Sequence, residues 1–208
     1  MKQDFSSFYI DKNNKVAFDI IKNIADNKQT NYSTILLCGK NGVGKSHLMV
    51  ALEQAAKGKS NIVRISSNQF IKMLKNKAIC SLYNVDILII EDVQFFVSTM
   101  KNEKEIYNSI KKLTIDKSIT IIMTIDKEIR DLENLEFISK LMQINYERNL
   151  ILEIKATLTN KTKRLIIKEF QNRNSIIIAE SKIKTLLKEC IGYQELQSKL
   201  NATKILSK

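Results

Sequence analysis

Residues 39–46 have the composition and spacing of a phosphate-binding loop. Their sequence, GKNGVGKS, fits the Walker A pattern G-x-x-x-x-G-K-[ST]. The glycines allow backbone N–H groups to converge on a phosphate, and a helix that begins at the end of the loop adds the positive end of its dipole. In this pattern Lys45 reaches the β- and γ-phosphates of a nucleotide, and Ser46 binds Mg²⁺. We therefore predict a nucleotide site whose loop contacts are Gly39, Asn41, Gly42, Val43, Gly44, Lys45, Ser46 and His47.

Two acidic residues, Glu91 and Asp92, follow a run of four apolar residues and supply the second half of such a site. In this Walker B arrangement the first acid reaches the metal and the second polarises the attacking water. We expect Glu91 to bind Mg²⁺ and Asp92 to act on the water, with Lys45 as the third catalytic residue. Thr124 and Asp126 end the next apolar run, where they either sense the γ-phosphate or form an ordinary polar strand end.

The elements that must position these residues alternate between strands and helices up to about residue 155. Short apolar runs predict strands, and apolar residues at helical spacing predict helices. This alternation predicts an α/β fold with a parallel five-stranded sheet and helices on both faces. Only helices are expected beyond residue 157, so we predict a nucleotide-binding core over 1–157 and a small helical lid over 158–208. The predicted strands are 34–38, 61–65, 85–90, 118–124 and 150–154, and the core helices are 14–27, 47–56, 69–77, 103–113 and 129–142.

The composition limits the classes of protein that fit this sequence of 208 residues. No stretch approaches the ~18 continuous apolar residues of a membrane span, and the N-terminus has no apolar signal region. The three cysteines, Cys38, Cys80 and Cys190, are far apart and form no metal-binding spacing. We expect a cytoplasmic protein without a membrane partner. The net charge of +12 indicates either a nucleic-acid partner or a general enrichment in lysine, because no long basic run is present.

Four segments together resemble the AAA+ ATPase domain of the bacterial replication initiator DnaA family. The segments 4–18, 39–48, 64–70 and 84–96 resemble, with some substitutions, the family patterns F-x-x-F-x-x…N-x-x-A, G-x-x-G-x-G-K-T-H-L, Y-I-S-S-x-x-F and N-V-D-V-L-L-I-D-D-I-Q-F-L. The resemblance implies a P-loop NTPase that binds ATP or ADP with Mg²⁺ and acts in the initiation of chromosomal DNA replication. The family's first segment lies over the adenine, which makes Tyr9, Ile10 and Asn14 candidate base contacts.

The sequence also departs from the initiator pattern. The segment 70–84 is short, and no counterpart of the helix-turn-helix domain follows the lid, a layout that resembles the short regulator Hda. No arginine lies at 143–146, where the family places one that acts on a neighbouring subunit; Lys140 and Arg148 are nearby. Gln194 stands where a second-sensor arginine is expected, so the resemblance implies nucleotide binding with weak hydrolysis by the chain alone.

The resemblance also implies partners. The initiator DnaA is the expected partner, and self-association is a further candidate. Hda-type proteins bind the sliding clamp through a glutamine followed by hydrophobic residues, a pattern that Met1–Gln3 and the residues after them match poorly. The alternatives are a DNA-binding initiator core, a helicase-loader-like ATPase, or an ATPase fold kept as an interaction scaffold.

Overall fold

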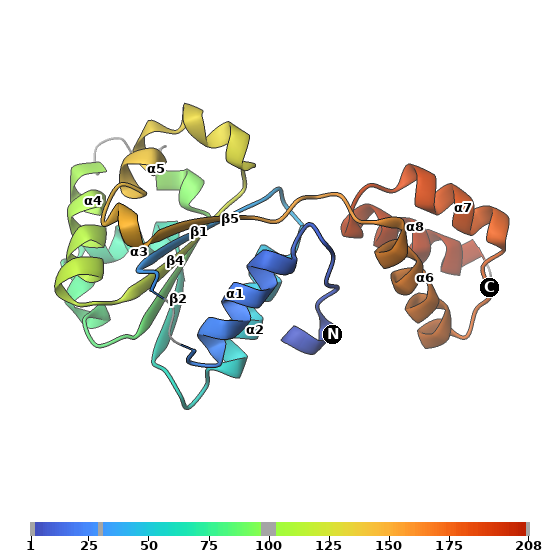
Figure 1. The fold of residues 1–208 in the computed structure, drawn as a ribbon, viewed down its shortest axis with the longest axis horizontal. Coiled ribbons are helices and arrows are strands. Elements are labelled where there is room, and N and C mark those ends of the chain that lie inside the picture. The colour runs from blue at the N-terminus through green and yellow to red at the C-terminus, as the bar shows by residue number, and fades with distance from the viewer. Residues whose placement is uncertain (1–2, 29–30, 97–102, 207–208) are drawn as a thin grey trace.

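The computed structural model describes residues 3–28, 31–96 and 103–206 (Figure 1). Its sheet has the strand order β2-β3-β4-β1-β5, and each neighbouring pair is parallel. The predicted five-stranded parallel sheet is therefore confirmed, with strand bounds that differ from the predicted ones by two residues or fewer. The strands are β1 (Thr34–Cys38), β2 (Ile62–Ser66), β3 (Ile87–Glu91), β4 (Thr120–Ile125) and β5 (Asn149–Glu153).

Helices cover both faces of the sheet, as predicted. The helices α1 (Lys15–Ala25) and α2 (Lys45–Ala55) lie on one face. The other face is covered by α3 (Ser67–Lys75), α4 (Glu103–Lys111) and α5 (Glu136–Leu141). Figure 1 shows this three-layer arrangement.

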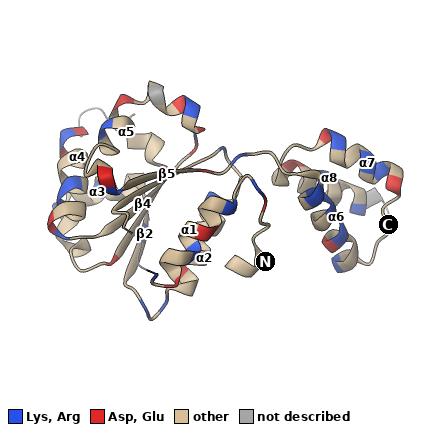
Figure 2. Ribbon diagram, in the orientation of Figure 1, with Lys and Arg blue, Asp and Glu red and all other residues tan. Residues whose placement is uncertain are grey.

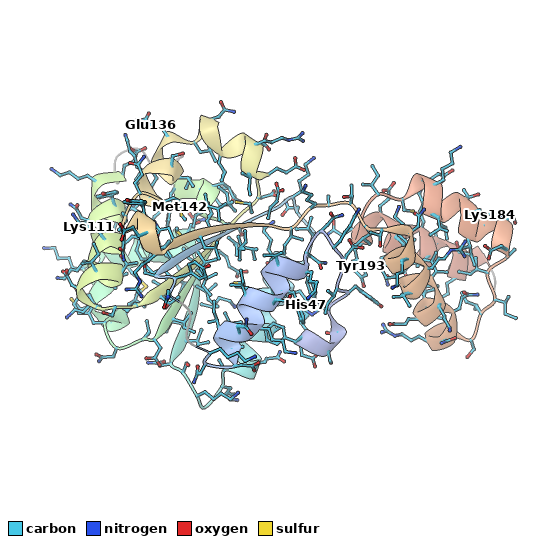
Figure 3. The ribbon with its side chains drawn as sticks, viewed as in Figure 1. His47, Lys111, Glu136, Met142, Lys184 and Tyr193 are labelled. Atoms are coloured by element: carbon cyan, nitrogen blue, oxygen red, sulfur yellow. The ribbon has the colours of Figure 1, made fainter. Side chains whose placement is uncertain are left out.

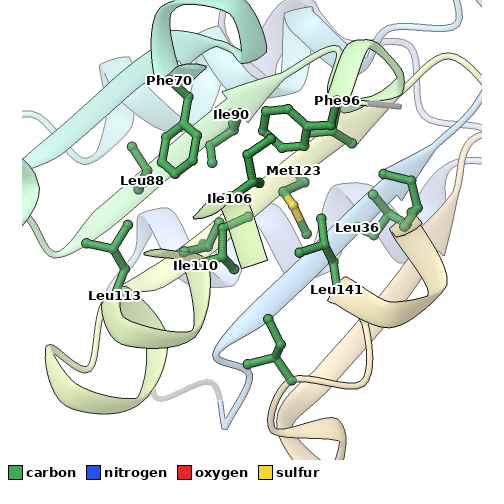
Figure 4. Close-up of a cluster of buried hydrophobic side chains, with 14 of the residues drawn as sticks. Leu36, Phe70, Leu88, Ile90, Phe96, Ile106, Ile110, Leu113, Met123 and Leu141 are labelled. Atoms are coloured by element: carbon green, nitrogen blue, oxygen red, sulfur yellow. The ribbon is translucent and has the colours of Figure 1, made fainter. Parts of the chain in front are cut away.

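The strands are apolar on both faces because both faces are buried. Side chains alternate along a strand, so Ile35 and Leu37 of β1 pack against α1 and α2, whereas Leu36 packs toward α3–α5. The Leu36 cluster, shown in Figure 4, includes Phe70 of α3 and Ile106 of α4. Continuous apolar runs in the sequence thus mark central strands of a parallel sheet.

Two predicted helices are interrupted. The segment predicted as one helix over 129–142 forms a 3₁₀ segment, Ile129–Asn134, followed by α5. The helix predicted over 103–113 ends at Lys111 and continues as a wider π-type turn, Lys112–Asp116. Helical spacing of apolar residues does not distinguish these neighbouring helix types.

Three helices follow the sheet: α6 (Asn160–Asn174), α7 (Glu180–Glu189) and α8 (Tyr193–Leu206). Figure 1 shows them apart from the sheet, joined to β5 by an extended segment. They form a separate apolar cluster, which supports the proposed division into a core and a lid near residue 157. The buried members of this cluster are Ile166, Ile167, Phe170, Ile178, Leu186, Cys190, Leu196 and Leu200. Across the ranges given above, no helix has the length and apolar character needed to cross a membrane.

Candidate functional site

The predicted site residues gather at the edge of the sheet where β1, β3 and β4 end. Cys38 of β1 is in register with Ile125 of β4, so the loop that follows β1 lies beside Asp126. Asp92 follows the end of β3, next to β4 in the sheet. The carboxyl ends of parallel strands form the crevice in which α/β folds bind their ligands.

Glycine is required where the phosphate-binding loop enters α2. Gly44 has φ +108°, and a Cβ atom built on it would lie 2.8 Å from the ring of Phe8. A side chain at this position would be strained by its backbone conformation and would also collide with the ring. Lys45 is the first residue of α2, so the free N–H groups of its first turn face the loop. The local geometry is that of an anion-binding helix terminus.

Lys45 lies within the loop and is 7% exposed. Its Nζ atom donates hydrogen bonds to the carbonyl oxygens of Gly39 at 2.5 Å and Lys40 at 3.0 Å, and it is 3.9 Å from Oδ1 of Asp126. Burial lowers the pKa of Lys45, and the nearby carboxylates of Asp126 and Asp92 act against that shift. A cation surrounded by carbonyl oxygens at a helix N-terminus is placed to meet phosphate oxygens.

The two acidic residues at the end of β3 face different partners. Glu91 accepts a hydrogen bond from Arg64 of β2 at 3.2 Å, and Arg64 also binds Glu53 of α2 at 3.1 Å. Asp92 has φ +60°, and its carboxylate acts on Lys45. The charge of Asp92 therefore acts on the phosphate-binding Lys45, whereas Glu91 is held by Arg64, which no local sequence pattern singles out.

Thr124 and Asp126 are held in one network with the Walker B turn. The buried Thr124 hydroxyl accepts a hydrogen bond from the Asp92 N–H at 3.2 Å. Gln94 accepts from the Asp126 N–H at 3.1 Å and donates to Oδ1 of Asp92 at 3.4 Å. Gln94 is not among the predicted site residues, although it lies within the segment 84–96 that carries part of the family resemblance. The network ties the Asp92 carboxylate and the Asp92 backbone to the end of β4.

The donor set fits Mg²⁺ that arrives with a nucleotide. Ser46 is exposed at the first turn of α2, and hydroxyl and carboxylate oxygens are ligands that Mg²⁺ prefers. The residues that the structure describes contain no cluster of three His, Cys, Asp or Glu side chains able to hold a metal. Mg²⁺ commonly uses one or two protein ligands together with waters and phosphate oxygens, so Ser46 and Glu91 suffice as candidates.

A cavity of about 370 Å³ lies beside the loop, between the N-terminal arm (residues 3–14) and the lid. This volume is within the usual range for small-molecule sites. Tyr9 and Asn14, two of the predicted base contacts, line the cavity, but Ile10 does not and is 48% exposed. The lining residues are Gln3, Ser7, Phe8, Tyr9, Asn14, Gly42, Val43, Gly44, His47, Leu158 and Tyr193.

Asn14 and His47 hold the arm in place. Asn14 donates to the Tyr9 carbonyl at 2.9 Å. The Nε2 atom of His47 lies 2.9 Å from the Asp4 carbonyl oxygen and 3.2 Å from the Ser7 hydroxyl. Figure 3 shows His47 where the arm meets α1 and α2, and Tyr193 at the lid. The side chains of Asn14 and His47 therefore position the arm and also line the cavity.

The lid reaches the phosphate-binding loop through Gln194. A Cβ atom built on Gly42 would lie 1.9 Å from Cδ of Gln194, so the amide of Gln194 lies directly on this glycine. The preceding residue, Tyr193, has its ring centroid 5.7 Å from that of Tyr9. The lid thus places a neutral amide against the loop, at the position where the resemblance implies an arginine.

The residues near the expected intersubunit arginine lie away from the loop. Arg148 donates to the Asn31 carbonyl at 2.9 Å, next to the start of β1. Asn145 donates to the Ser33 hydroxyl at 3.2 Å. Lys140 forms an ion pair with Glu136 at 2.6 Å. The contacts of Arg148 and Asn145 are at the start of β1, the end of that strand opposite the chain's own phosphate-binding loop.

The strand order, the Walker A loop and the Walker B turn define the fold as that of an AAA+ P-loop NTPase. A sequence profile described as the bacterial DnaA ATPase domain matches residues 1–153, and the chain belongs to this family. The family resemblance and the predicted fold class are therefore confirmed.

Individual relatives agree with the family match. The chain is 29% identical to the chromosomal replication initiator protein DnaA of Nautilia profundicola over 184 residues, which cover 85% of this chain and 41% of the relative. It is 26% identical to the DnaA of Aquifex aeolicus, covering 98% of this chain and 52% of the relative. The chain thus spans about half of the length of these relatives or less.

Solved structures show the same fold. The structure of AMPPCP-bound DnaA from Aquifex aeolicus has a TM-score of 0.75 at 23% identity and matches 98% of this chain and 64% of that one. The DnaC helicase loader has a TM-score of 0.56 at 18% identity, over 74% of this chain and 97% of that one. At these identities the likeness concerns the fold.

Proposed function

We propose that this chain is an adenine-nucleotide switch of the Hda kind, which regulates the initiation of chromosomal replication through contact with the initiator DnaA. The observation that carries the proposal is the buried Lys45, held between loop carbonyls and Asp126 at the start of α2. The cavity beside the loop supplies space for a nucleoside. The family membership supports a role in replication initiation.

The ligand that fits best is ATP or ADP with Mg²⁺. When bound, Mg²⁺ would neutralise charge on the phosphates. Lys45 would bind the phosphate oxygens, Ser46 and Glu91 would hold the metal, and Asp92 would orient a water. A related DnaA structure carries AMPPCP, which supports nucleotide binding by this fold.

Hydrolysis by the chain alone is expected to be slow. Arginine stabilisation of the transition state contributes roughly 10³–10⁵ in rate in phosphoryl-transfer enzymes. Gln194 lies on the loop but carries no charge, and Arg148 is directed toward Asn31. The chain therefore suits a nucleotide-dependent contact with a partner better than rapid turnover.

Addition of this chain with ATP or ADP is expected to raise the ATP hydrolysis rate of the cognate initiator at least about tenfold, which requires only ~1.4 kcal/mol of transition-state stabilisation. Lys45→Ala should abolish the increase, because the nucleotide site would no longer be filled. Phosphate release by the initiator, with and without each variant, measures the effect.

The matched control for this assay is Lys59→Ala, which removes an exposed lysine after α2. It should leave the stimulation unchanged. If the wild-type chain neither stimulated the initiator nor bound it in a pull-down, the regulatory proposal would be wrong even if nucleotide binding were intact.

A second candidate function is nucleic-acid binding, which the charge distribution favours. Figure 2 shows basic residues over both the core and the lid. The Nζ atoms of Lys112 and Lys117 lie 5.1 and 4.6 Å from the ring centroid of Tyr83, which combines positive charge with an aromatic surface. The DnaA structures among the relatives include one with AMPPCP and single-stranded DNA.

Under this second function a labelled single-stranded oligonucleotide would bind the chain more weakly as salt is raised. The slope of log K against log salt is about −0.7 per phosphate contact. Reversing the charges with Lys112→Glu and Lys117→Glu should remove about two contacts, and Lys57→Glu at an exposed site is the control. Absence of binding at low salt would eliminate this function.

The remaining partner predictions have no structural test. Met1 and Lys2, in the predicted sliding-clamp segment, lie outside the described residues. The clamp contact, self-association and the cytoplasmic location stay predictions.

A further inference from the structure

Asp11 joins the N-terminal arm to the first turn of the lid helix α6. Its Oδ2 atom accepts hydrogen bonds from the N–H of Thr159 at 2.9 Å, from the Thr159 hydroxyl at 2.7 Å and from the Thr162 hydroxyl at 2.6 Å. Thr159 is the N-cap residue of α6. A carboxylate beside a helix N-terminus is favoured by the free N–H groups and by the helix dipole. The side chain of Asp11 therefore fixes where the lid begins.

The backbone of Asp11 is fixed to the core. Its carbonyl accepts hydrogen bonds from the N–H groups of Asn14 at 3.1 Å and Lys15 at 2.9 Å, at the start of α1. Its own N–H donates to Oδ1 of Asn14 at 2.7 Å. Asp11 is 5% exposed, so water does not readily replace these bonds. One residue thus binds the first turn of a core helix and the first turn of a lid helix.

The charge of Asp11 strengthens this link. Burial by itself would raise the pKa of Asp11, but hydrogen bonds from Thr162 and Thr159 outweigh burial, and the pKa lies below its ordinary value. The side chain is therefore ionised at neutral pH. Hydrogen bonds to an ionised acceptor are roughly twice as strong as neutral ones.

Two other residues of the arm, Tyr9 and Asn13, contact the lid region through more exposed hydrogen bonds. Tyr9 donates its hydroxyl to Glu169 at 2.8 Å, and Asn13 donates to the Thr157 carbonyl at 2.8 Å. Polar contacts open to water contribute less than buried ones. Asp11 is thus the main polar anchor between the arm and α6.

A short path leads from α6 to the phosphate-binding loop. The N–H of Leu158, next to the N-cap residue, donates to the Ile191 carbonyl at 2.9 Å. This bond ties the start of α6 to the turn before α8. Gln194 lies in the first turn of α8, with its amide on Gly42. The contacts from Asp11 to Gly42 are therefore continuous.

We propose that Asp11 is a positioning residue that holds the lid, and with it Gln194, against the phosphate-binding loop. The effect of Asp11 on ligand binding rests on the proposed nucleotide site. A Gln194 side chain that is already held in place loses less conformational entropy when it forms a hydrogen bond to a bound nucleotide. The position of the lid itself is a property of the nucleotide-free chain. The two can therefore be tested separately.

Hydrogen exchange of the nucleotide-free chain tests the position of the lid. Asp11→Ala should speed exchange of the Thr159 N–H at least about tenfold, together with the N–H groups at the start of α8. Asp11→Asn keeps one carbonyl oxygen and should restore part of the protection. Asp19→Ala, which removes an exposed carboxylate of α1, is the matched control and should leave exchange at Thr159 unchanged. Increased exchange confined to Thr159, with α8 unaffected, would overturn the proposal.

A double-mutant cycle tests the link to Gln194. Gln194→Ala in the otherwise wild-type chain should weaken ATP binding about three- to tenfold, the value of one neutral hydrogen bond. In the Asp11→Ala background the same change should have almost no effect, because Gln194 is no longer held on Gly42. Calorimetric titration with ATP and Mg²⁺ measures all four proteins.

General destabilisation would make the two changes additive, so additivity would overturn the proposal. If Asp11→Ala fails to fold, Thr162→Val removes one donor to the same carboxylate and should reduce the effect of Gln194→Ala partly. If the wild-type chain binds no nucleotide, the proposed function fails, and hydrogen exchange alone decides the role of Asp11.

Discussion

Lys45→Ala is expected to weaken ATP binding by about 100-fold, since hydrogen bonds to charged groups contribute ~1.5–3 kcal/mol and 1.4 kcal/mol is a factor of ten. The side chain is buried at the first turn of α2 and is held by the carbonyls of Gly39 and Lys40. Alanine would leave the phosphates facing Asp126, a carboxylate whose Oδ1 atom is now 3.9 Å from the lysine. Titration calorimetry with ATP and Mg²⁺ measures the change.

The control for this substitution is Lys40→Ala in the same loop. Lys40 contributes a backbone carbonyl to Lys45, which alanine keeps, and its own side chain is exposed and pairs with Glu128 at 3.4 Å. An exposed ion pair contributes ~0–1 kcal/mol, so affinity should change by no more than about fivefold. The increase in melting temperature that ATP produces should persist in this variant and disappear in Lys45→Ala. Equal affinities for the two variants would contradict the assignment of Lys45 to the phosphates.

Phe8→Ala is expected to lower the free energy of unfolding by about 3 kcal/mol or more, as is usual for a buried phenylalanine. The ring contacts Gly44, stacks on Phe18 with centroids 5.7 Å apart, and meets His47 edge-on at 5.2 Å. It joins the arm, the phosphate-binding loop and α1. A loss of this size is a large part of the ~5–15 kcal/mol that stabilises a typical domain. Urea denaturation of the nucleotide-free chain measures it.

Phe8→Ala should also weaken nucleotide binding, because the Phe8 ring lines the cavity beside the phosphate-binding loop. The control is Tyr146→Ala, which removes an aromatic ring that is 72% exposed and should change stability by no more than about 0.5 kcal/mol. If Phe8→Ala lowered stability no more than this control, the arm would not be packed on the loop as described.

The fold was largely predictable because its signals are local in the sequence. The phosphate-binding loop is encoded by eight consecutive residues, and each central strand is a short apolar run. Parallel pairing then places the end of β3 and the end of β4 at the edge of the sheet that carries the loop. Strand direction places Asp92, Thr124 and Asp126 at the same end of the sheet, and the strand order brings β3 beside β4.

Side chains that act across long sequence separations were not predictable. Arg64 binds Glu91, 27 residues away, because β2 and β3 are neighbours in the sheet. Nothing in the spacing of these residues indicates the pair. The same holds for Gln94, whose two amide ends reach Asp92 and Asp126 only in the folded turn.

The sequence by itself determined the phosphate-binding loop, the acidic strand end, the parallel sheet and the family, since each depends on consecutive residues with defined backbone preferences. Tertiary structure alone decided that Asp11 binds Thr159, 148 residues away, and that Gln194 lies on Gly42. These contacts depend on how the lid is placed against the arm. That placement is set by buried hydrogen bonds between distant segments, which local patterns do not encode.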